Sequence, residues 1–355
     1  MGSAKTKDAI DGQVIYYKSS EEMSEVEDDS VDAIVTSPPY NRHKQYSADD
    51  EQKYDDNKPV DEYFQFLRKV WSECYRVLSP TGVFFLNIGD AAKSQGLSEQ
   101  VVESAVAVGF IRLQTIIWVK SIFGKGHFTP SGGNRRLNNL WENIFVLVKD
   151  KKRYQIFPKD IGIPYADKSN IGRYGESDLR DAGNVWFIPY RVTSGASLKK
   201  GHDAPFPVEL PVKCARLTRA QRILDPFGGT GSTLAASKLL GIQGIAYEKY
   251  PRKEVIRGRV GGDHGFVEEP PTLLPHLEAT IELLSETLNK LNLSNPATLF
   301  KSTKRECNRL EIVQQTLQNM NLRVDIIDQF LAQPNEDSPD DRQKLRKFLD
   351  KDGSR

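Results

Sequence analysis

Five consecutive residues, Thr36–Tyr40 (TSPPY), could bind and orient an amino group. They follow an apolar run, Val31–Val35, that predicts a buried strand. A proline has no N–H group and forces extended geometry on the residue before it, so this strand would end in bare carbonyl acceptors beside the Ser37 hydroxyl. Such acceptors can take the N–H protons of an amino group on a planar heterocycle, and the Tyr40 ring can stack on that heterocycle. The alternative is an ordinary turn closed by two prolines.

A second run, Asp225–Thr233 (DPFGGTGST), follows a short apolar segment and leads into a predicted helix, Ser232–Leu240. Glycines after a strand let the backbone approach a ligand closely, and a helix N-terminus adds N–H donors. The run lacks the Gly-Lys-Ser/Thr of a phosphate-binding loop and the spacing of the dinucleotide fingerprint. Asp225 at the mouth of this loop suits a ligand with a cationic or amino group. The next predicted strand, Gly244–Tyr247, leads to Glu248, which is placed to accept hydrogen bonds from ribose hydroxyls.

Both runs need a scaffold that brings strand ends together. Short apolar runs alternate with segments of helical periodicity, which predicts an α/β fold with a doubly wound, mostly parallel sheet covered on both faces. The predicted strands are Val31–Val35, Gly82–Ile88, Thr115–Val119, Asn143–Val148, Arg222–Leu224 and Gly244–Tyr247. The predicted helices are Val60–Leu78, which the segment 79–82 ends, and Ser232–Leu240. Because parallel strands share one carboxyl edge, both runs are expected at that edge.

Composition limits the class of protein. The chain has 355 residues, of which 38% are hydrophobic and 27% charged, as is typical of a soluble globular protein with about two domains. A net charge of +1 excludes a uniformly basic protein, so any contact with nucleic acid must be local. Neither a membrane-spanning run nor a secretory signal is evident, and three distant cysteines build no disulfide framework. We therefore expect a cytoplasmic protein with no membrane association.

Charge is unevenly distributed along the chain. Residues 21–32 hold seven acidic groups and no basic one, whereas residues 120–153 hold eight basic and two acidic groups. The second stretch also carries four glycines and predicts a long mobile loop that could grip phosphates. A solvated surface loop is the alternative. The five histidines show no ligand spacing, so no metal site is predicted.

The two runs resemble motifs of the amino-methylating DNA methyltransferases, which use S-adenosylmethionine. Thr36–Tyr40 resembles their catalytic motif in its Ser-Pro-Pro-Tyr form, and Asp225–Gly231 resembles the loop that binds the methionine part of the cofactor. Three more blocks are similar to those of the family: His202–Pro211, Trp141–Ile144 with Lys149, and Gly183–Trp186. The resemblance covers roughly residues 10–260. A catalytic motif that precedes the cofactor motif is the permuted order of the family's beta group, as in restriction–modification systems.

The resemblance implies a class I methyltransferase-like fold, permuted, and direct attack of an exocyclic nitrogen on the sulfonium methyl of S-adenosylmethionine, with the target base flipped out of the duplex. The catalytic residues it implies are Ser37, Pro38, Pro39 and Tyr40. The cofactor-binding residues it implies are Phe206, Pro207, Glu209, Asp225, Phe227, Gly228, Gly229, Thr230, Gly231, Ser232 and Glu248. In the family, Ser at the position of Ser37 goes mostly with cytosine N4 and Asp mostly with adenine N6, so methylation of cytosine N4 is expected.

Three alternatives stay open at this point. The first is an N6-adenine DNA methyltransferase that carries Ser37. The second is a catalytically silent DNA-binding subunit with the same fold. The third, methylation of RNA or of a protein amide, uses the same chemistry, but Asn usually stands at the position of Ser37 in the protein-amide relatives.

Double-stranded DNA is the partner that the resemblance implies, and loops that vary in the family would read its sequence. Those loops are expected at residues 42–59, 120–140 and 151–200. The candidate DNA-binding residues are Lys125, Arg135, Arg136, Lys152, Arg153 and Arg173. We expect the basic loops to form a DNA-facing cleft near Tyr40. Trp118 is expected in the core and Lys120 at the surface, and Asp90 either contacts the cofactor or the base or caps the end of a strand.

The chain is expected to divide into a catalytic domain, residues 1–262, and a helical C-terminal region, residues 263–355. The second part has no glycine from 266 to 352 and carries leucine at helical spacing. It would mediate dimerisation or cover an exposed face of the sheet, so a monomer or a homodimer through these helices is expected. A cognate restriction endonuclease is expected to act on the same DNA without direct contact.

Overall fold

The computed structural model describes residues 7–41, 58–90, 95–120, 139–165, 168–173, 175–188, 206–250, 252–262 and 266. The chain divides into two compact units, Met1–Leu273 and Leu274–Arg355, and the second lies outside the described residues. The predicted helical C-terminal region, apart from Phe266, therefore stays a prediction.

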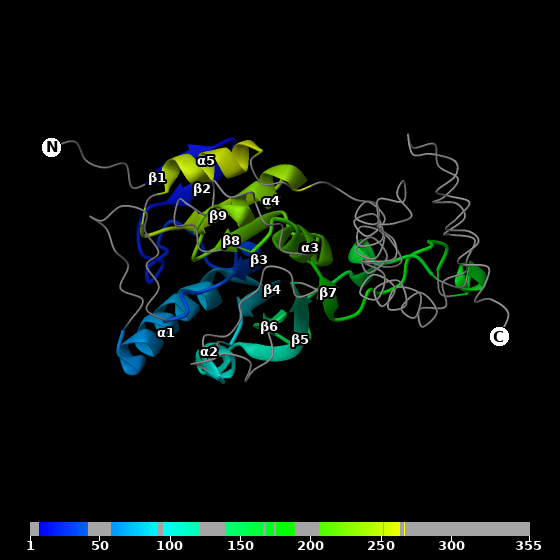
Figure 1. The fold of residues 1–355 in the computed structure, drawn as a ribbon, viewed down its shortest axis with the longest axis horizontal. Coiled ribbons are helices and arrows are strands. Elements are labelled where there is room, and N and C mark those ends of the chain that lie inside the picture. Colours follow the sequence, from blue (N-terminus) through cyan, green and yellow to red (C-terminus); the bar gives the residue numbers. More distant parts are fainter. Residues whose placement is uncertain are drawn as a thin grey trace, which may run out of the picture. The chain divides into compact units, whose positions relative to one another are not determined.

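The described part of the first unit is built on a nine-stranded sheet (Figure 1). In chain order the strands are β1 Lys7–Ile10, β2 Gln13–Tyr16, β3 Val31–Thr36, β4 Leu78–Ile88, β5 Ile111–Val119, β6 Trp141–Val148, β7 Val185–Phe187, β8 Arg222–Asp225 and β9 Gln243–Tyr247. Across the sheet the order is β1-β2-β9-β8-β3-β4-β6-β5-β7. Neighbours from β2 through β4 are parallel, as are β5 and β7, whereas β1 and β6 run antiparallel to their neighbours. The predicted α/β class with a mostly parallel sheet is confirmed.

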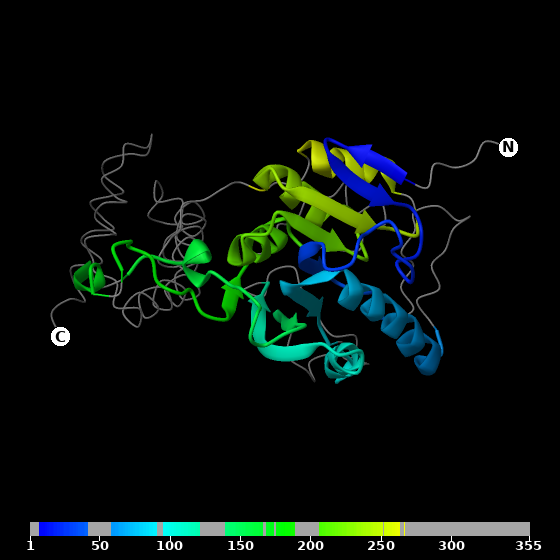
Figure 2. The same ribbon diagram turned by 180° about the vertical axis from the view of Figure 1, so that it is seen from behind.

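Helices cover both faces of this sheet. They are α1 Val60–Val77, α2 Leu97–Val106, α3 Glu209–Thr218, α4 Ser232–Leu240 and α5 Lys253–Gly261, with two short 3-10 turns, η1 Pro158–Ile161 and η2 Lys168–Asn170. The ribbon seen from front and back shows α5 beside β1 and β2, and α1 beside β3 and β4 (Figures 1 and 2). The predicted bounds of α4 are confirmed, and α1 ends one residue before the predicted end.

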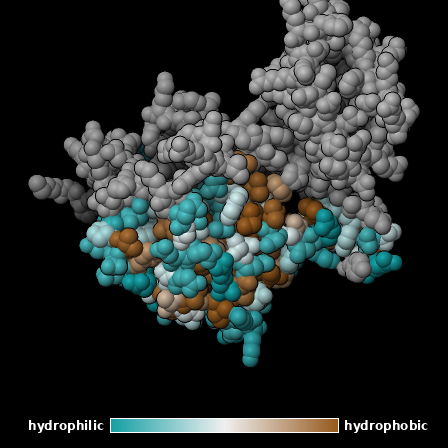
Figure 3. All heavy atoms as spheres, turned by 60° about the horizontal axis from the view of Figure 1, so that its bottom comes forward, coloured by the Kyte–Doolittle hydropathy of each residue, from teal (hydrophilic) through white to brown (hydrophobic). Residues whose placement is uncertain are grey.

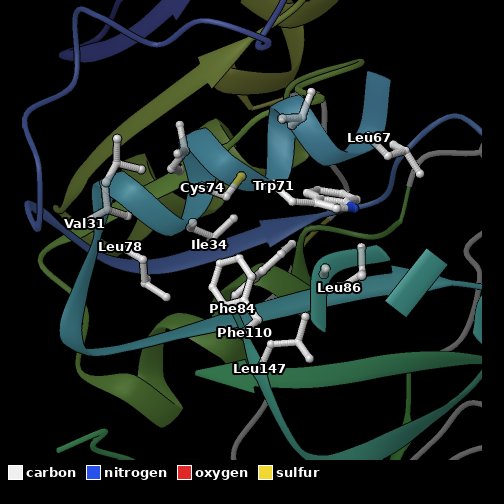
Figure 4. Close-up of a cluster of buried hydrophobic side chains, with 14 of the residues drawn as sticks. Val31, Ile34, Leu67, Trp71, Cys74, Leu78, Phe84, Leu86, Phe110 and Leu147 are labelled. Atoms are coloured by element: carbon white, nitrogen blue, oxygen red, sulfur yellow. The ribbon is translucent and has the colours of Figure 1, made fainter. Parts of the chain in front are cut away.

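Period-two alternation in the strands supplies both faces of the core. In β3, Ile34 packs with Trp71 of α1 and Phe84 of β4, as Figure 4 shows, whereas Ala33 and Val35 belong to the cluster that includes α3. All these side chains are fully buried. Strand β3 is therefore buried on both faces over most of its length, which explains why it appears in the sequence as an almost continuous apolar run.

Strand β4 begins earlier than the sequence predicts. The segment 79–82 was expected to separate helix from strand, but β4 follows α1 directly at Leu78. Pro80 lies in an irregularity of the ladder, between the pairs Val31–Leu78 and Ala33–Val83. A bulge is one of the few places where a strand accepts a proline, because no ladder hydrogen bond is needed from it.

Two acidic residues of segment 21–32, Asp28 and Asp29, pair with cations from distant parts of the chain. Arg76 at the end of α1 donates to the carbonyl oxygens of Met23 and Val26 and pairs with Asp28. Lys149, just after β6, pairs with Asp29. This segment is therefore part of the scaffold at the amino ends of β3 and β4.

The described surface is mixed in character. Figure 3 shows hydrophilic side chains over much of the described surface in that view, with hydrophobic ones among them. Single exposed apolar side chains are normal on a folded protein. Within the described ranges, no helix is long and apolar enough to cross a membrane.

Candidate active site

The two runs that could do chemistry lie side by side because β3 and β8 are adjacent parallel strands. Ala33 pairs with Ile223 and Ile34 with Leu224, so both runs leave the sheet at the same edge. Glu248 follows β9, the next strand across, at this edge as well. We call this edge the site edge: the carboxyl ends of β3, β4, β5, β8 and β9 and the amino end of β6, together with the segments next to them.

A buried carboxylate joins the two runs directly. Asp225, only 1% exposed, accepts hydrogen bonds from the Thr36 hydroxyl at 2.6 Å, the Thr233 hydroxyl at 2.8 Å and the Phe227 N–H at 3.0 Å. None of these donors is charged, and burial raises the pKa of Asp225 to about 6. Asp225 therefore bonds to the chain itself rather than standing at the mouth of the loop, and it holds the end of β3 against the start of α4.

The glycine-rich loop lies close against β9 and α5. The Gly228 N–H donates to the Tyr247 carbonyl at 2.8 Å, and a Cβ at Gly228 would lie 2.9 Å from the Ala246 Cβ. At Gly231, φ is +86° and a Cβ would lie 3.1 Å from Ile256. A side chain at either position would thus push the loop away from its neighbours, and at Gly231 the backbone conformation itself favours glycine.

Phe227 anchors the loop to the other face of the sheet. Its ring centroid lies 5.9 Å from that of Phe66 and 6.0 Å from that of Trp71, both on α1. The half-buried side chain therefore packs against the core cluster that contains Trp71.

Three features of the loop suit a small polar ligand. The Thr230 hydroxyl oxygen is buried and has no hydrogen-bond partner among the residues that the structure describes. Glu248, half-buried, accepts the N–H groups of Gly229 at 2.8 Å and Tyr250 at 2.9 Å. Burial raises the pKa of Glu248 to about 7. The N-terminus of α4 begins at Ser232, where N–H groups have no partner within the helix.

The segment before α3 closes the site from one side. The Ser232 hydroxyl donates to the Phe206 carbonyl at 2.8 Å and accepts from Arg259 at 3.0 Å. Pro207 follows Phe206, and Glu209 is the first residue of α3. The structure thus brings these predicted cofactor residues next to the glycine-rich loop, although they precede it by some twenty residues, whereas residues 202–205 lie outside the described ranges.

The end of β3 is fixed on its other side by α1. Tyr63, in the first turn of α1, donates from its hydroxyl to the Pro39 carbonyl at 2.8 Å. Asn41, at φ +51°, exchanges two hydrogen bonds with the backbone of Lys58, at 2.8 and 2.9 Å. Pro38 is buried, whereas Ser37 and Tyr40 are half-buried. The carbonyl of Pro39 is therefore engaged by the protein itself.

An ion pair stands beside Tyr40. The hydroxyl oxygens of Ser37 and Tyr40 are 3.2 Å apart, and the Tyr40 hydroxyl lies 3.2 Å from a carboxylate oxygen of Glu142. The other oxygen of Glu142 is 2.8 Å from the Lys120 ammonium. The Lys120 side chain is only 8% exposed, so the prediction that it lies at the surface is wrong. From the sequence, Glu142 is notable only as a member of the segment Trp141–Ile144, which is similar to a block of the methyltransferase family.

Asp90 and Trp118 also lie near this edge, and both have structural roles. Asp90 accepts the N–H groups of Gly96 at 3.2 Å and Ser98 at 2.9 Å, so it caps the start of α2. Trp118 is 1% exposed, which confirms it as a core residue. Among the described residues, no group of three or more His, Cys, Asp or Glu could hold a metal ion.

The basic stretch 120–153 is not one loop, and that prediction is wrong. Strand β6, Trp141–Val148, runs through it and is antiparallel to β4. Lys120 and Asn139 lie at the site edge, where Asn139 donates to the Asp90 carbonyl. Eight strand residues span about 25 Å, and Lys149 beyond them contacts the Leu78 carbonyl at the start of β4.

The candidate DNA-binding residues are accordingly scattered. Lys125, Arg135 and Arg136 lie outside the described residues, in a segment whose two ends are at the site edge. Lys152 and Arg153 are exposed at the opposite edge, away from Tyr40, so the expected cleft near Tyr40 does not include them. Arg173 is exposed within an excursion between β6 and β7 that the bridge between Ile163 and Arg180 closes at its base.

Comparison with known proteins gives consistent matches. A model of the N6/N4 DNA methylase family matches residues 31–256. The type II methyltransferase M.MjaI of Methanocaldococcus jannaschii is 28% identical over 284 residues, covering 70% of this chain and 90% of that protein. The type II methyltransferase M.MthZI of Methanothermobacter thermautotrophicus is 28% identical over 325 residues, covering 82% and 87%. The PvuII DNA methyltransferase (cytosine-N4-specific) shares the fold, with a TM-score of 0.53, 18% identity, and coverage of 73% of this chain and 89% of that one.

Proposed function

Because the chain belongs to the N6/N4 DNA methylase family, we propose that it methylates the exocyclic N4 of a flipped cytosine at a specific site in double-stranded DNA. It is a DNA methyltransferase, and its methyl donor is S-adenosylmethionine. The observation that carries the cytosine assignment is Ser37 at the end of β3, within hydrogen-bond distance of Tyr40. In the family that this sequence resembles, Ser at this position goes mostly with cytosine N4.

The residues around the glycine-rich loop fit the cofactor. Its amino-acid end carries a carboxylate, which suits the free N–H groups at the start of α4 and the unpartnered Thr230 hydroxyl. Its ribose hydroxyls suit the Glu248 carboxylate, which keeps acceptor capacity beyond its two backbone bonds. When bound, the cofactor supplies a methyl group on a positively charged sulfur.

The chain's own part in the reaction is to hold the base. We assign the Ser37 oxygen and the Pro38 carbonyl as acceptors for the N–H groups of the target amine, which turns the nitrogen lone pair toward the methyl group. Tyr40 stacks on the ring of the flipped base. The cofactor would supply the methyl group, and its sulfur would keep the electron pair of the broken carbon–sulfur bond. The amine nitrogen would take the methyl carbon, and its extra proton would pass to the Ser37 oxygen, the Pro38 carbonyl or water. No protein nucleophile is required.

We propose that DNA binds at the site edge. The segments that contain Lys125, Arg135 and Arg136 begin and end there, and we assign them to phosphate and base contacts. We further propose that residues 1–262 form the catalytic domain. The protein would act on cytoplasmic, nucleoid-associated DNA in a restriction–modification system, together with an endonuclease that it does not contact directly.

The test is a product analysis. Full-length protein is incubated with methyl-labelled S-adenosylmethionine and unmethylated DNA, and the DNA is digested to nucleosides. We expect labelled N4-methylcytosine. Labelled N6-methyladenine with no N4-methylcytosine would overturn the base assignment and establish the adenine alternative. Loss of methylation in Tyr40→Ala with DNA binding retained would exclude a silent DNA-binding role.

A further inference from the structure

The reaction described above makes no use of Lys120 and Glu142, although both are held beside its centre. Their side chains are 8% and 15% exposed and 2.8 Å apart. Taking two charges out of water is costly unless further hydrogen bonds compensate, so such a pair at an active site calls for an explanation. The remaining oxygen of Glu142 faces the Tyr40 hydroxyl at 3.2 Å.

Lys120, Glu142, Tyr40 and Ser37 form a row of three hydrogen bonds. The chemistry of these groups fixes the direction of each bond. Lys120 can only donate, and an ionised carboxylate can only accept, so Tyr40 donates its single hydroxyl hydrogen to Glu142. Tyr40 then has no hydrogen left for Ser37. The Ser37 hydroxyl must therefore donate to Tyr40, over 3.2 Å, and the lone pairs of Ser37 remain for another donor.

Gly89, just after the neighbouring strand β4, leaves space for the Glu142 side chain because it has no side chain of its own. A Cβ at Gly89, just after β4, would lie 2.6 Å from Cγ and 3.0 Å from Cδ of Glu142. Lys120 and Tyr40 hold the far end of that side chain, so it cannot swing away freely. Any side chain at position 89 would therefore displace the Glu142 carboxylate.

We propose that Glu142 and Lys120 are positioning residues for methyl transfer: Glu142 fixes the hydroxyl of Tyr40 and thereby makes Ser37 an obligate acceptor for the target amine, and Lys120 fixes Glu142. This inference rests on the proposed function, in which Ser37 and Tyr40 bind the target base. A Ser37 hydroxyl free to rotate could present its hydrogen to the amine and compete for the nitrogen lone pair. The row of bonds from Lys120 removes that orientation.

The first experiment measures methyl transfer in a single turnover with saturating S-adenosylmethionine and DNA. For Glu142→Gln we expect the rate constant to fall by about 10- to 100-fold, because the amide can turn its NH₂ group toward Tyr40 and reverse the row. Dissociation constants for S-adenosylmethionine and DNA should stay unchanged, since the proposal gives Glu142 no contact with either. A wild-type rate constant in Glu142→Gln would overturn the proposal.

Glu73→Gln is the matched control. Glu73 pairs with Arg76, and their side chains are 20% and 29% exposed. On α1, Glu73 lies ten residues after Tyr63, about 15 Å along the helix. This variant loses a comparable ion pair but leaves Tyr40 untouched, so its rate constant should equal that of the wild type. An equal loss in both variants would show a general effect of stability and overturn the proposal.

Two double-variant cycles test whether Glu142 acts on methyl transfer through Tyr40, and whether position 89 acts through Glu142. In Tyr40→Phe the ring stays but the row of hydrogen bonds is already broken. Adding Glu142→Gln should therefore not lower the rate constant of methyl transfer further. Gly89→Ala alone should lower the rate constant, and it should have no effect in a Glu142→Ala background, where the methyl group has space. Additive losses in either cycle would contradict the proposed route.

The outcomes for the proposal and for the proposed function differ. If the wild-type protein transfers no methyl group to DNA, the proposed function fails. If the wild-type protein is active and Glu142→Gln is equally active, only the positioning role fails. An adenine product leaves the experiment intact, because the same rate constants are then measured on adenine.

Discussion

Two carboxylates at the site edge, that of the buried Asp225 and that of the half-buried Glu142, are held in opposite ways. Asp225 accepts from two hydroxyls and a backbone N–H, and no ion pair among the described residues gives it a cation. Glu142 accepts from a lysine ammonium and a phenol. Both touch the Thr36–Tyr40 segment, one at each end.

This difference in hydrogen-bond donors indicates that Asp225 has a structural role and Glu142 a role in positioning the catalytic groups. Neutral donors hold Asp225 without offsetting the cost of its charge, which is why its pKa is raised to about 6. Its contribution is architectural, because it ties the end of β3 to the loop after β8. The cation beside Glu142 instead sets the direction of a row of hydrogen bonds. Changes at Asp225 should therefore appear in stability, and changes at Glu142 chiefly in catalysis.

The largest effect is expected for Asp225→Leu. This change leaves the hydroxyls of Thr36 and Thr233 and the N–H of Phe227 buried without an acceptor, and we expect the free energy of unfolding to fall by about 3–5 kcal/mol. Urea denaturation followed by circular dichroism measures it. Asp225→Asn keeps one acceptor oxygen and should lose less than half as much. Equal losses would show that the hydrogen bonds are not what matters.

The next effect is the pH dependence of stability that Asp225 causes. The carboxyl titrates near 3.8 in the unfolded chain and at about 6 in the folded protein. Between these values the folded protein holds a proton that the unfolded chain has lost, so the free energy of unfolding falls as pH rises from about 4 to 6, by up to about 3 kcal/mol.

Asp225→Asn isolates this contribution. Glu248, whose pKa is raised to about 7, causes a fall in the same direction, but it does so in both proteins. The stability of the wild type relative to Asp225→Asn should therefore decrease over this pH range. A constant difference between the two proteins would contradict the buried, cation-free account of Asp225.

A third prediction concerns the cation beside Glu142. Lys120→Met leaves the half-buried carboxylate of Glu142 without its cation and should destabilise the protein by about 2–3 kcal/mol. Replacing both residues by methionine should restore much of that loss, yet methyl transfer should stay slow. The control is Lys238→Met, whose exposed pair with Asp11 is worth no more than about 1 kcal/mol. If Lys120→Met is as mild as the control, the pair is not desolvated in solution.

The smallest expected effect is on cofactor affinity. The ionised carboxylate of Glu248 is the better acceptor for ribose hydroxyls, and burial raises its pKa to about 7. From pH 6 to pH 8 the ionised fraction rises about tenfold, so S-adenosylmethionine should bind up to about tenfold more tightly at pH 8. Isothermal titration calorimetry checks this. Glu248→Gln should bind weakly and show a flatter pH dependence.

The sequence predicted the strands that are apolar at most positions, because burial on both faces leaves a nearly continuous apolar run. It missed β1 and β2, which are four residues long and partly polar, and the three-residue β7. The proximity of the two runs was also predictable, since both follow strands of a parallel sheet. That part of the candidate site depends only on local patterns.

The interior position of Lys120 could not be predicted, because it depends on pairing between strands. Lysine after an apolar strand looks solvated until Glu142 is placed beside it by the antiparallel pairing of β5 and β6. The same strand direction carries Lys152 and Arg153 to the far edge. Strand direction follows from packing of the whole sheet, which a run of eight residues does not encode.

The first and last elements of the described unit are neighbours. Strand β2 pairs in parallel with β9, and Arg257 of α5 forms a 2.9 Å ion pair with Asp8 of β1. A short peptide could join residue 262 to residue 7, and the ring so formed could be opened within residues 121–138 instead. Such a circular permutant would place the glycine-rich loop before the Ser-Pro-Pro-Tyr segment in the sequence while keeping both at one edge of the sheet. The order of the two motifs in the sequence is thus set by the position of the chain ends, and the arrangement of the motifs at the sheet edge does not depend on it.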